Sequence, residues 1–232
     1  MQQMPSRMTV VGEQEKPDHY HLAGDALCMF WGEYTPWRHT NGQNYNFSPT
    51  NQLISNFKKK LDRRGGADWP YKEVATRDVA RAFARMWQWN ALMEQGRFVL
   101  VPMPPSKARS DPMYDARMLD VLRLMAVEAG IEFDIRDCLS FSGQLPASHD
   151  SDDRPTPDQL YGHLALDPLA GRVNEPPTLI FLYDDVLTTG AHYAAAVRRL
   201  QEAFPGVQIV GQFVARRVVP NPFANLSIAD TF

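Results

Sequence analysis

The sequence predicts an α/β protein built on a mainly parallel sheet. Short, continuous apolar runs with the length of strands lie near residues 97, 131, 178 and 207. Such runs are typical of strands that are buried on both faces, as in a parallel sheet. Helical patterns near residues 115 and 190 alternate with these strands. This alternation favours parallel pairing through right-handed crossover connections.

Length and composition are those of an ordinary soluble globular protein. The chain has 232 residues, of which 44% are hydrophobic and 22% are charged. This is enough for one α/β domain with a sizeable core, or for one domain and a subdomain. The formal net charge of -3 gives no general attraction to nucleic acids or anionic membranes. We therefore expect no nucleic-acid partner unless a local basic patch provides one.

We expect a cytoplasmic protein with no membrane segment. The sequence has no apolar stretch approaching the ~20 residues of a membrane span, and residues 1–20 lack the apolar core of a signal peptide. Cys28 and Cys138 are the only cysteines and lie far apart in the sequence. This usage indicates reduced thiols rather than a disulfide scaffold.

Residues 1–95 are expected to form a mainly helical hood. Residues 25–37 are aromatic and apolar and predict a strand followed by a turn, whereas Ser48–Phe57 and Tyr71–Gln95 have the patterns of helices. A basic run follows the first of these helices and consists of Lys58, Lys59, Lys60, Arg63 and Arg64. Such a run is usually a solvated face favoured by the helix dipole, and contact with phosphate or nucleic acid is the alternative.

Residues 96–232 are expected to form the α/β core. Its first strand is predicted at Arg97–Met103, and an amphipathic helix is predicted at roughly 115–129. The loop between them carries Ser106, Lys107 and Arg109. A strand, a basic loop and a helix in this order are typical of a site that binds anions near the start of the helix.

The rest of the core is expected to contain further strands and one long loop. Ile131–Phe141 predicts one or two strands, and Val207–Arg216 predicts a last buried strand, after which Arg216 and Arg217 lie where ligands bind in open parallel sheets. Residues 142–157 have the composition of a loop, in which His149 and Arg154 are able to act on phosphate or substrate. The alternative is an exposed linker without chemistry.

The segment Thr178–His192 contains the most informative motif. An apolar strand, Leu179–Tyr183, is followed by the carboxylates of Asp184 and Asp185, then by Thr188-Thr189-Gly190 and a helix predicted at Ala191–Phe204. The unpaired N–H groups at the start of that helix form an anion site, and the two carboxylates suit sugar hydroxyls or a hydrated Mg²⁺. A ribose 5-phosphate satisfies both. The alternative is purely structural, since a strand-end Asp is often a helix cap and Thr-Gly often a turn.

The motif resembles the phosphoribosyl pyrophosphate (PRPP) signature of type I phosphoribosyltransferases. The resemblance implies a parallel sheet of the type I phosphoribosyltransferase kind beneath a hood, with a homodimer common in the family. It further implies that Asp184 and Asp185 hold the ribose hydroxyls and Mg²⁺, and that Ser106 and Lys107 contact the pyrophosphate, with Arg109 as a further candidate. The 5-phosphate would be bound by Thr188, Thr189, Gly190, Ala191 and His192. His192 departs from the pattern, which usually has Thr or Ser there.

By resemblance, the expected activity is transfer of phosphoribosyl from PRPP to an unidentified acceptor, with Mg²⁺ and release of pyrophosphate. Two alternatives remain. One is a regulator that senses PRPP or a nucleotide without turnover. The other is a nucleotide-consuming effector hydrolase, in which the basic segment 58–64 contacts a larger substrate or partner.

Overall fold

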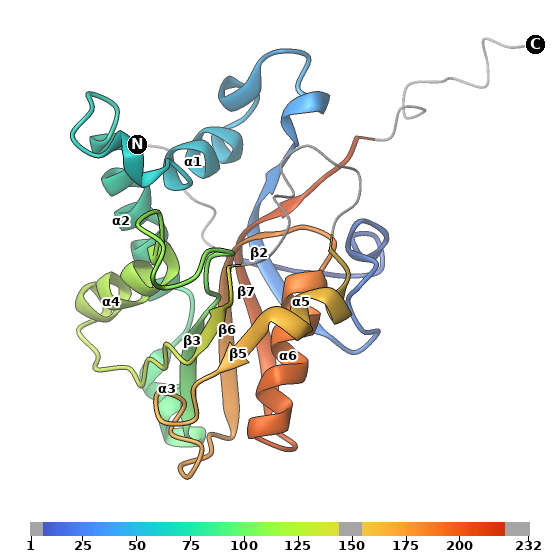
Figure 1. Ribbon diagram of the computed structural model, residues 1–232, viewed down its shortest axis with the longest axis vertical. Coiled ribbons are helices and arrows are strands. Elements are labelled where there is room, and N and C mark those ends of the chain that lie inside the picture. Colours follow the sequence, from blue (N-terminus) through green and yellow to red (C-terminus); the bar gives the residue numbers. More distant parts are fainter. Residues whose placement is uncertain (1–6, 144–154, 221–232) are drawn as a thin grey trace, which may run out of the picture.

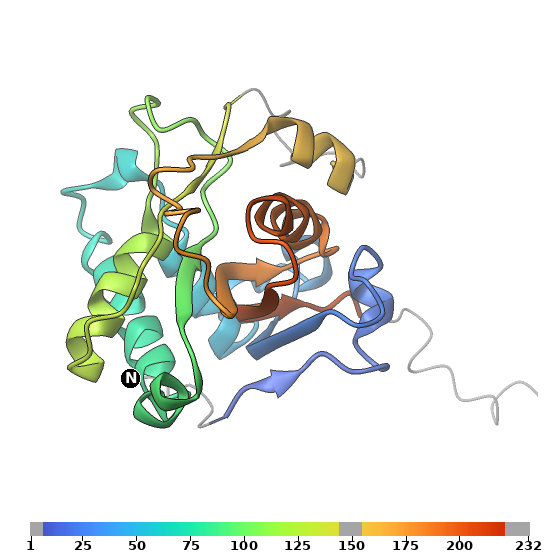
Figure 2. The ribbon, with the colours of Figure 1, turned by 90° about the horizontal axis from the view of Figure 1, so that it is seen from below.

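The computed structural model describes residues 7–143 and 155–220, and shows a five-stranded sheet between two layers of helices (Figures 1 and 2). The strand order is β1-β2-β7-β6-β3. These strands are Thr9–Val10 (β1), Leu27–Tyr34 (β2), Phe98–Pro102 (β3), Leu179–Leu187 (β6) and Gln208–Arg217 (β7). Only β1 runs antiparallel to its neighbour. The expected α/β class with a mainly parallel sheet is confirmed.

The helices of the described residues include six α-helices. They are α1 (Pro49–Phe57), α2 (Pro70–Ala84), α3 (Trp89–Gln95), α4 (Arg117–Ala129), α5 (Pro157–His163) and α6 (Ala191–Ala203). Short 3₁₀ helices are formed by Lys16–His19, Trp37–His39, Asn44–Asn46 and Leu61–Arg63. In the part of the chain that the structure describes, no helix is long and apolar enough to cross a membrane.

Each face of the sheet carries its own hydrophobic core. One core packs α6 and α5 against the sheet, and Leu200 and Leu160 are fully buried in it. The other packs α1, α2 and α4 against the opposite face, where Phe83 of α2 meets Tyr183 edge to face at a centroid distance of 4.7 Å. Helices therefore cover both faces, which explains why the strands are apolar runs rather than alternating patterns.

The N-terminal region is not purely a hood, which corrects the expected boundary at residue 95. Strands β1 and β2 belong to the sheet, and β2 pairs in parallel with β7 from Leu27 to Tyr34. The side chains of β2 serve both cores, since Cys28 and Phe30 face one and Trp31 faces the other. Helices α1 and α2, which we call the hood together with the loop that joins them, lie on the face that α4 also covers (Figure 1).

The single helix expected at Tyr71–Gln95 is wrong, because α2 ends at Ala84 and α3 begins at Trp89. The Trp89 indole N–H donates to the Ala84 carbonyl at 2.8 Å and closes the break. The Trp89 ring also packs on Phe98, Phe133 and Phe181, with ring centroids 4.9–5.9 Å apart. Burying this ring favours two short helices over one continuous helix.

The expectation of core strands from Ile131–Phe141 is also corrected. This segment contributes a single parallel bridge, Leu100 to Ile135, to the main sheet. Its end, Leu139–Phe141 (β4), instead pairs antiparallel with Leu164–Leu166 (β5) in a separate two-stranded sheet. The buried Arg136 lies in this segment, and its guanidinium donates to the carbonyls of Gly171, Arg172 and Glu175, which ties the segment to the loop before β6.

Candidate functional site

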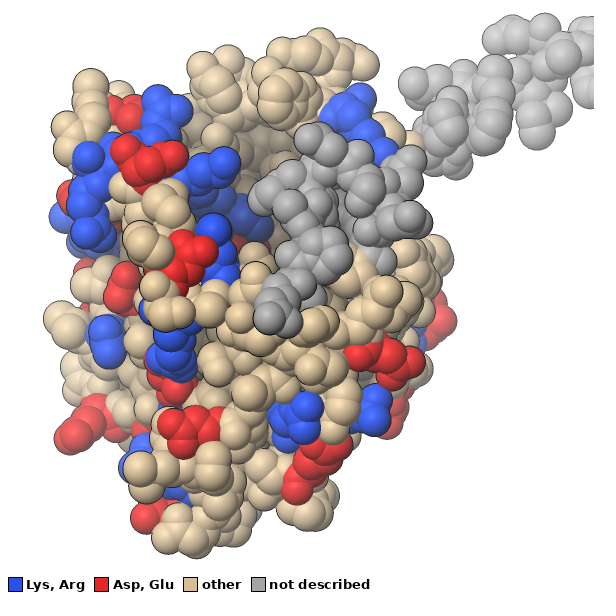
Figure 3. All heavy atoms as spheres, in the orientation of Figure 1, with Lys and Arg blue, Asp and Glu red and all other residues tan. Residues whose placement is uncertain are grey.

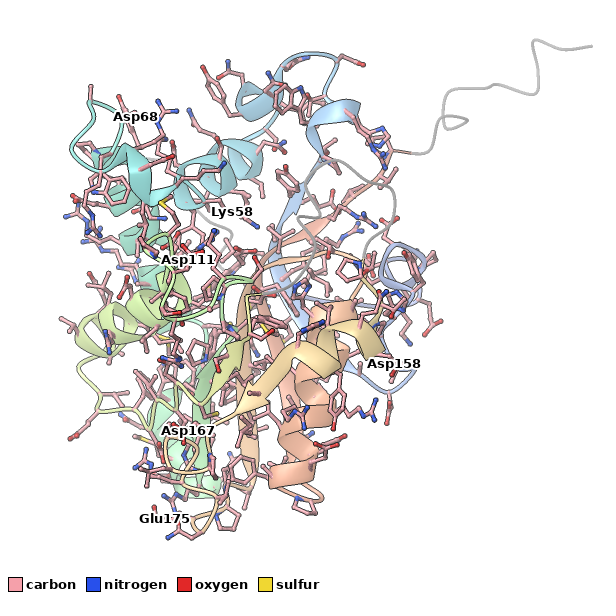
Figure 4. The ribbon with its side chains drawn as sticks, in the orientation of Figure 1. Lys58, Asp68, Asp111, Asp158, Asp167 and Glu175 are labelled. Atoms are coloured by element: carbon pink, nitrogen blue, oxygen red, sulfur yellow. The ribbon has the colours of Figure 1, made fainter. Side chains whose placement is uncertain are left out.

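The expected site residues gather at the carboxyl ends of β3, β6 and β7, the edge where ligands bind in open parallel sheets. Figure 4 shows Lys58 and Asp111 above these strand ends, on the side of α1 and of the loop that follows β3. The loop after β3 lies directly beside β6, because the Met103 N–H donates to the Tyr183 carbonyl at 2.8 Å. The structure therefore brings the two predicted anion-binding loops to one edge of the sheet.

Strand β6 continues through the acidic pair, Asp184 and Asp185, whereas the sequence predicts that the strand ends at Tyr183. Asp184 pairs with Phe213 and Leu187 with Arg216 of β7. The strand hydrogen bonds thus hold the backbone of both carboxylates in a fixed register. The loop that follows is short, and only Thr188, Thr189 and Gly190 separate β6 from α6.

Gly190 is the N-cap of α6 and adopts the left-handed conformation, with φ 87°. A Cβ atom at this position would lie 2.9 Å from Leu22 Cδ2 and 3.1 Å from the Leu22 backbone nitrogen. Both constraints require glycine here. The first N–H groups of α6 have no carbonyl partner within the helix and point out of its end, as an anion site requires.

An N-terminal segment that the sequence analysis did not connect with the site packs against this loop. The His21 N–H donates to the Thr189 carbonyl at 2.9 Å, and His19 Nδ1 donates to the Thr188 carbonyl. His19 is buried, and this burial lowers its pKa, although the bond to Thr188 and the Asp18 charge oppose the shift. Residues 19–22 therefore fix the loop from outside.

The pKa values of the two carboxylates are shifted in opposite directions. Burial, together with the negative charge of Asp185, raises the pKa of Asp184 to about 7. The Asp185 N–H donates to Asp184 Oδ1 at 2.7 Å, which ties the two residues together. Burial also acts on Asp185, but the positive charges of Lys58 and Arg117 outweigh it and lower its pKa.

Asp185 is held by two cations from elements far away in the sequence. Lys58 Nζ lies 3.0 Å from Oδ1, and an Arg117 NH1 group lies 3.1 Å from Oδ2. Lys58 follows α1, and Arg117 is the first residue of α4. From the sequence, Lys58 is expected in a basic run on a solvated face, and no pattern singles out Arg117.

A buried lysine completes this network. Arg117 Nε contacts Asp115 Oδ2 at 3.2 Å, and Lys72 Nζ contacts the same oxygen at 2.9 Å. Lys72 is only 6% exposed and also donates to the carbonyls of Phe57 and Lys59, at 2.8 and 3.0 Å. The chain of contacts from Lys72 to Asp185 therefore joins the hood helices to the carboxyl end of β6.

The residues expected to bind pyrophosphate lie in the loop after β3, and the ion pairs of Lys107 and Arg109 are with residues other than the acidic pair. Ser106 and Lys107 are exposed in the loop after β3. Within the described residues, Lys107 forms an ion pair with Asp111 at 2.9 Å rather than with the acidic pair. Arg109 bonds Asp137 at 2.6 Å and the Leu139 carbonyl at 3.2 Å, so it anchors the loop to β4.

The remaining expected residues are divided between the loop, the edge of the sheet and the undescribed segment. The His192 ring lies edge-on to Phe141, with centroids 5.7 Å apart. Arg216 pairs with Asp18 at 3.3 Å and with Glu33 at 2.6 Å, and Arg217 is buried. His149 and Arg154 lie outside the described residues.

The acidic pair fits Mg²⁺ only as a partial site. No group of three or more His, Cys, Asp or Glu residues able to hold a metal occurs among residues 7–143 and 155–220. Mg²⁺ commonly keeps several waters and is bound by one or two carboxylates together with substrate phosphates. Asp184 and Asp185 match this kind of site, in which the ion arrives with a phosphorylated ligand.

A separate pocket of about 1040 Å³ lies beside β4, β5 and α6, and its lining includes Ser142, His163 and Arg199. Neither Asp184 nor Asp185 nor any residue of the loop 188–190 lines this pocket. The comparisons with known proteins add no assignment, because neither a protein-family model nor a curated protein matches this chain. The fold and the site thus define an α/β protein with an acidic pair on β6, followed by a short glycine-containing loop at the start of α6.

Proposed function

We propose that this protein is a phosphoribosyltransferase-like enzyme that uses PRPP and Mg²⁺ and transfers phosphoribosyl to an acceptor. One observation carries the proposal. Two carboxylates near the end of β6, Asp184 and Asp185, lie six and five residues before Gly190, the glycine with φ 87° that caps helix α6. Carboxylate oxygens that accept from sugar hydroxyls and a helix N-terminus that binds a phosphate are the two groups that a pentose phosphate requires.

Residues 188–192, which we call the phosphate loop, would bind the 5-phosphate. Backbone N–H groups at the start of α6 and the hydroxyls of Thr188 and Thr189 supply donors, and His192 adds a ring nitrogen. Thr189 is buried, and its Oγ1 accepts the Ala191 N–H at 3.4 Å, which shapes the loop. Leu22 and His21 hold the loop in place from the other side.

The acidic pair would orient the sugar. Asp184 and Asp185 accept hydrogen bonds from the 2- and 3-hydroxyls, and they would hold a hydrated Mg²⁺ that neutralises charge on the leaving pyrophosphate. The acceptor forms its bond to C1 while the bond from C1 to the pyrophosphate oxygen breaks, and the pyrophosphate leaves with the electron pair. The protein acts by positioning and electrostatics, and neither Asp attacks the sugar.

Calorimetric titration with PRPP, with and without Mg²⁺, tests the proposal when released pyrophosphate is assayed in the same sample. We expect binding that strengthens with Mg²⁺ and release of pyrophosphate in the presence of an acceptor. The double substitution Asp184→Asn and Asp185→Asn should abolish that release. No binding of PRPP at millimolar concentration, or unchanged turnover in the double variant, would remove the proposal.

A PRPP-sensing regulator without turnover is the second candidate. It is favoured by one observation, namely that Asp185 and Lys107 are both engaged in ion pairs within the chain. The same titration separates the two functions. PRPP binding without pyrophosphate release, across a panel of bases and amines as acceptors, would identify the sensor.

A further inference from the structure

The cations around Asp185 are not equivalent. Arg117 is held by two carboxylates, Asp115 and Asp185, and its side chain is 18% exposed. Among the residues that the structure describes, Lys58 has a single ion-pair contact, to Asp185 at 3.0 Å, and its side chain is 44% exposed. Arg117 is therefore part of the framework, whereas Lys58 is able to leave Asp185 by rotating its long and flexible side chain.

Cations from the hood and from α4 surround the acidic pair and the nearby Asp115. Three cations, those of Lys58, Lys72 and Arg117, share the carboxylates of Asp115 and Asp185. When the ribose hydroxyls engage Asp185, the Lys58 ammonium would leave its carboxylate and stand unpaired beside the site. A positive charge at that place attracts an anionic group of the ligand.

The surface around Lys58 is consistent with an anion entering there. Figure 3 shows Lys and Arg atoms along one side of a hollow in the upper half of the molecule. Lys58 extends toward the strand ends from the end of α1, on the hood side of the site (Figure 4). The phosphate loop begins three residues after Asp185, which is at most about 11 Å of extended chain. A pentose that carries a phosphate on one end and a diphosphate on the other bridges such a span.

We propose that Lys58 binds the diphosphate of the ligand and that its ion pair with Asp185 holds it in place until the ligand arrives. The proposal rests on the proposed function and adds a residue of the hood to the site. The ligand hydroxyls take over Asp185, and the Lys58 ammonium moves to the diphosphate oxygens. Arg117 stays on Asp115 and Asp185 and keeps the acidic pair in position.

The test compares two fragments of the ligand by calorimetry on the full chain. Inorganic pyrophosphate probes the Lys58 site, and ribose 5-phosphate probes the phosphate loop and the acidic pair. The variants are Lys58→Gln, the charge-conserving Lys58→Arg, and Lys60→Gln as a matched control, since Lys60 is an exposed lysine of the same basic run. Thermal unfolding of each variant checks that the fold is intact.

We expect Lys58→Gln to weaken pyrophosphate binding roughly tenfold or more, because this is the loss of affinity expected when one hydrogen bond from a charged donor is removed. The affinity of Lys58→Gln for ribose 5-phosphate should change by less than about twofold, because this fragment carries no diphosphate. Lys58→Arg and Lys60→Gln should bind pyrophosphate nearly as tightly as the parent does.

Two results would overturn the inference, and they are distinguishable. If the parent binds both fragments and Lys58→Gln binds pyrophosphate equally well, Lys58 is not a diphosphate ligand although the proposed function stands. If the parent binds neither fragment, the proposed function fails and the inference fails with it.

Discussion

At the scale of single residues, the charges around the acidic pair determine what each group can do. Asp184 and Asp185 are neighbours in one strand, but only Asp185 has cations on both of its oxygens. Burial acts to raise both pKa values, and it prevails for Asp184, whereas the two cations outweigh it and lower the pKa of Asp185. The sequence identifies the pair, while Lys58 and Arg117 make the two carboxylates differ.

The buried Lys72 should be essential for stability. Replacing it by Met in the Lys72→Met variant removes one of the two cations that contact Asp115. It also leaves the buried Phe57 carbonyl and the partly buried Lys59 carbonyl without the lysine donor. We expect a loss of about 2–4 kcal/mol in the free energy of unfolding, measured with chemical denaturant. Lys60→Met is the control and should change stability by less than about 0.5 kcal/mol. Equal stabilities of the two variants would contradict the role of Lys72.

His19 should make stability depend on pH. Because Nδ1 donates to the Thr188 carbonyl, the ring is the Nδ1–H tautomer, and its Nε2 is buried without a partner among the described residues. Its folded pKa lies below the unfolded value of 6.5, with Asp18, Arg216 and Arg217 as the charged groups that face it. The unfolded chain therefore binds a proton first, so this contribution is complete above about pH 7 and is lost as the pH falls through 6.5.

The variant His19→Asn tests this pH dependence, since Asn keeps a donor for the Thr188 carbonyl but does not titrate. We expect its free energy of unfolding to fall less than that of the parent between pH 7.5 and 5.5. His39→Asn is the control, because His39 lies in a 3₁₀ helix away from the phosphate loop. A parent and a His19→Asn variant with the same pH slope would disprove the prediction.

At the scale of elements, the site depends on how β6, the phosphate loop and α6 follow one another. The sequence predicts this order correctly, and α6 begins at Ala191 as expected. The sequence does not predict that β6 runs on to Leu187, because pairing with β7 extends the strand through the two acids. Long-range pairing outweighs the low strand propensity of Asp.

Gly190→Ala should damage the phosphate loop more than backbone strain alone explains. Gly190 and Gly206 both have positive φ, 87° and 78°, but a Cβ at Gly206 meets nothing within 4 Å, whereas one at Gly190 meets Leu22 at 2.9 Å. Gly206→Ala therefore measures the backbone cost, about 1 kcal/mol. We expect Gly190→Ala to cost about 1–3 kcal/mol more in unfolding experiments, since the clash adds to the strain. It should also weaken binding of ribose 5-phosphate, and equal effects of the two substitutions would contradict the close contact with Leu22.

At the scale of the whole molecule, hood and core share one sheet. Strand β2 pairs with β7 from Leu27 to Tyr34, and α2 covers Phe181 and Tyr183 of β6. The division into residues 1–95 and 96–232 therefore separates residues that pack together. The ion pairs from Lys72 to Asp185 cross the same boundary and couple the hood to the acidic pair.

A fragment of residues 96–232 should consequently not fold by itself. It lacks β2, so the apolar edge of β7 is uncovered, and it lacks α2, so the aromatic side chains of β6 face solvent. We expect the isolated fragment to show no cooperative thermal transition by circular dichroism, whereas the full chain unfolds cooperatively. A cooperative transition in the fragment would show that residues 96–232 are an independent domain.

The local elements follow from the sequence because they depend on local chemistry. Ser48 accepts the Asn51 N–H at 3.0 Å and caps α1, and Gly130 ends α4 in the left-handed conformation, both as their residue types favour. The motif of two acids, Thr-Thr and Gly190 is likewise local. The sequence alone therefore defines the α/β class, most of the helices and the candidate site.

The tertiary structure decides the long-range pairing and the charge state of the site. It places β2 beside β7, sends Leu139–Phe141 to a second sheet, and brings His19 to the Thr188 carbonyl across 169 positions in the sequence. It also delivers Lys58 and Arg117 to Asp185 from two different helices. No periodicity or spacing encodes such contacts, because they arise only when distant segments compete to bury apolar surface and to pair their charges.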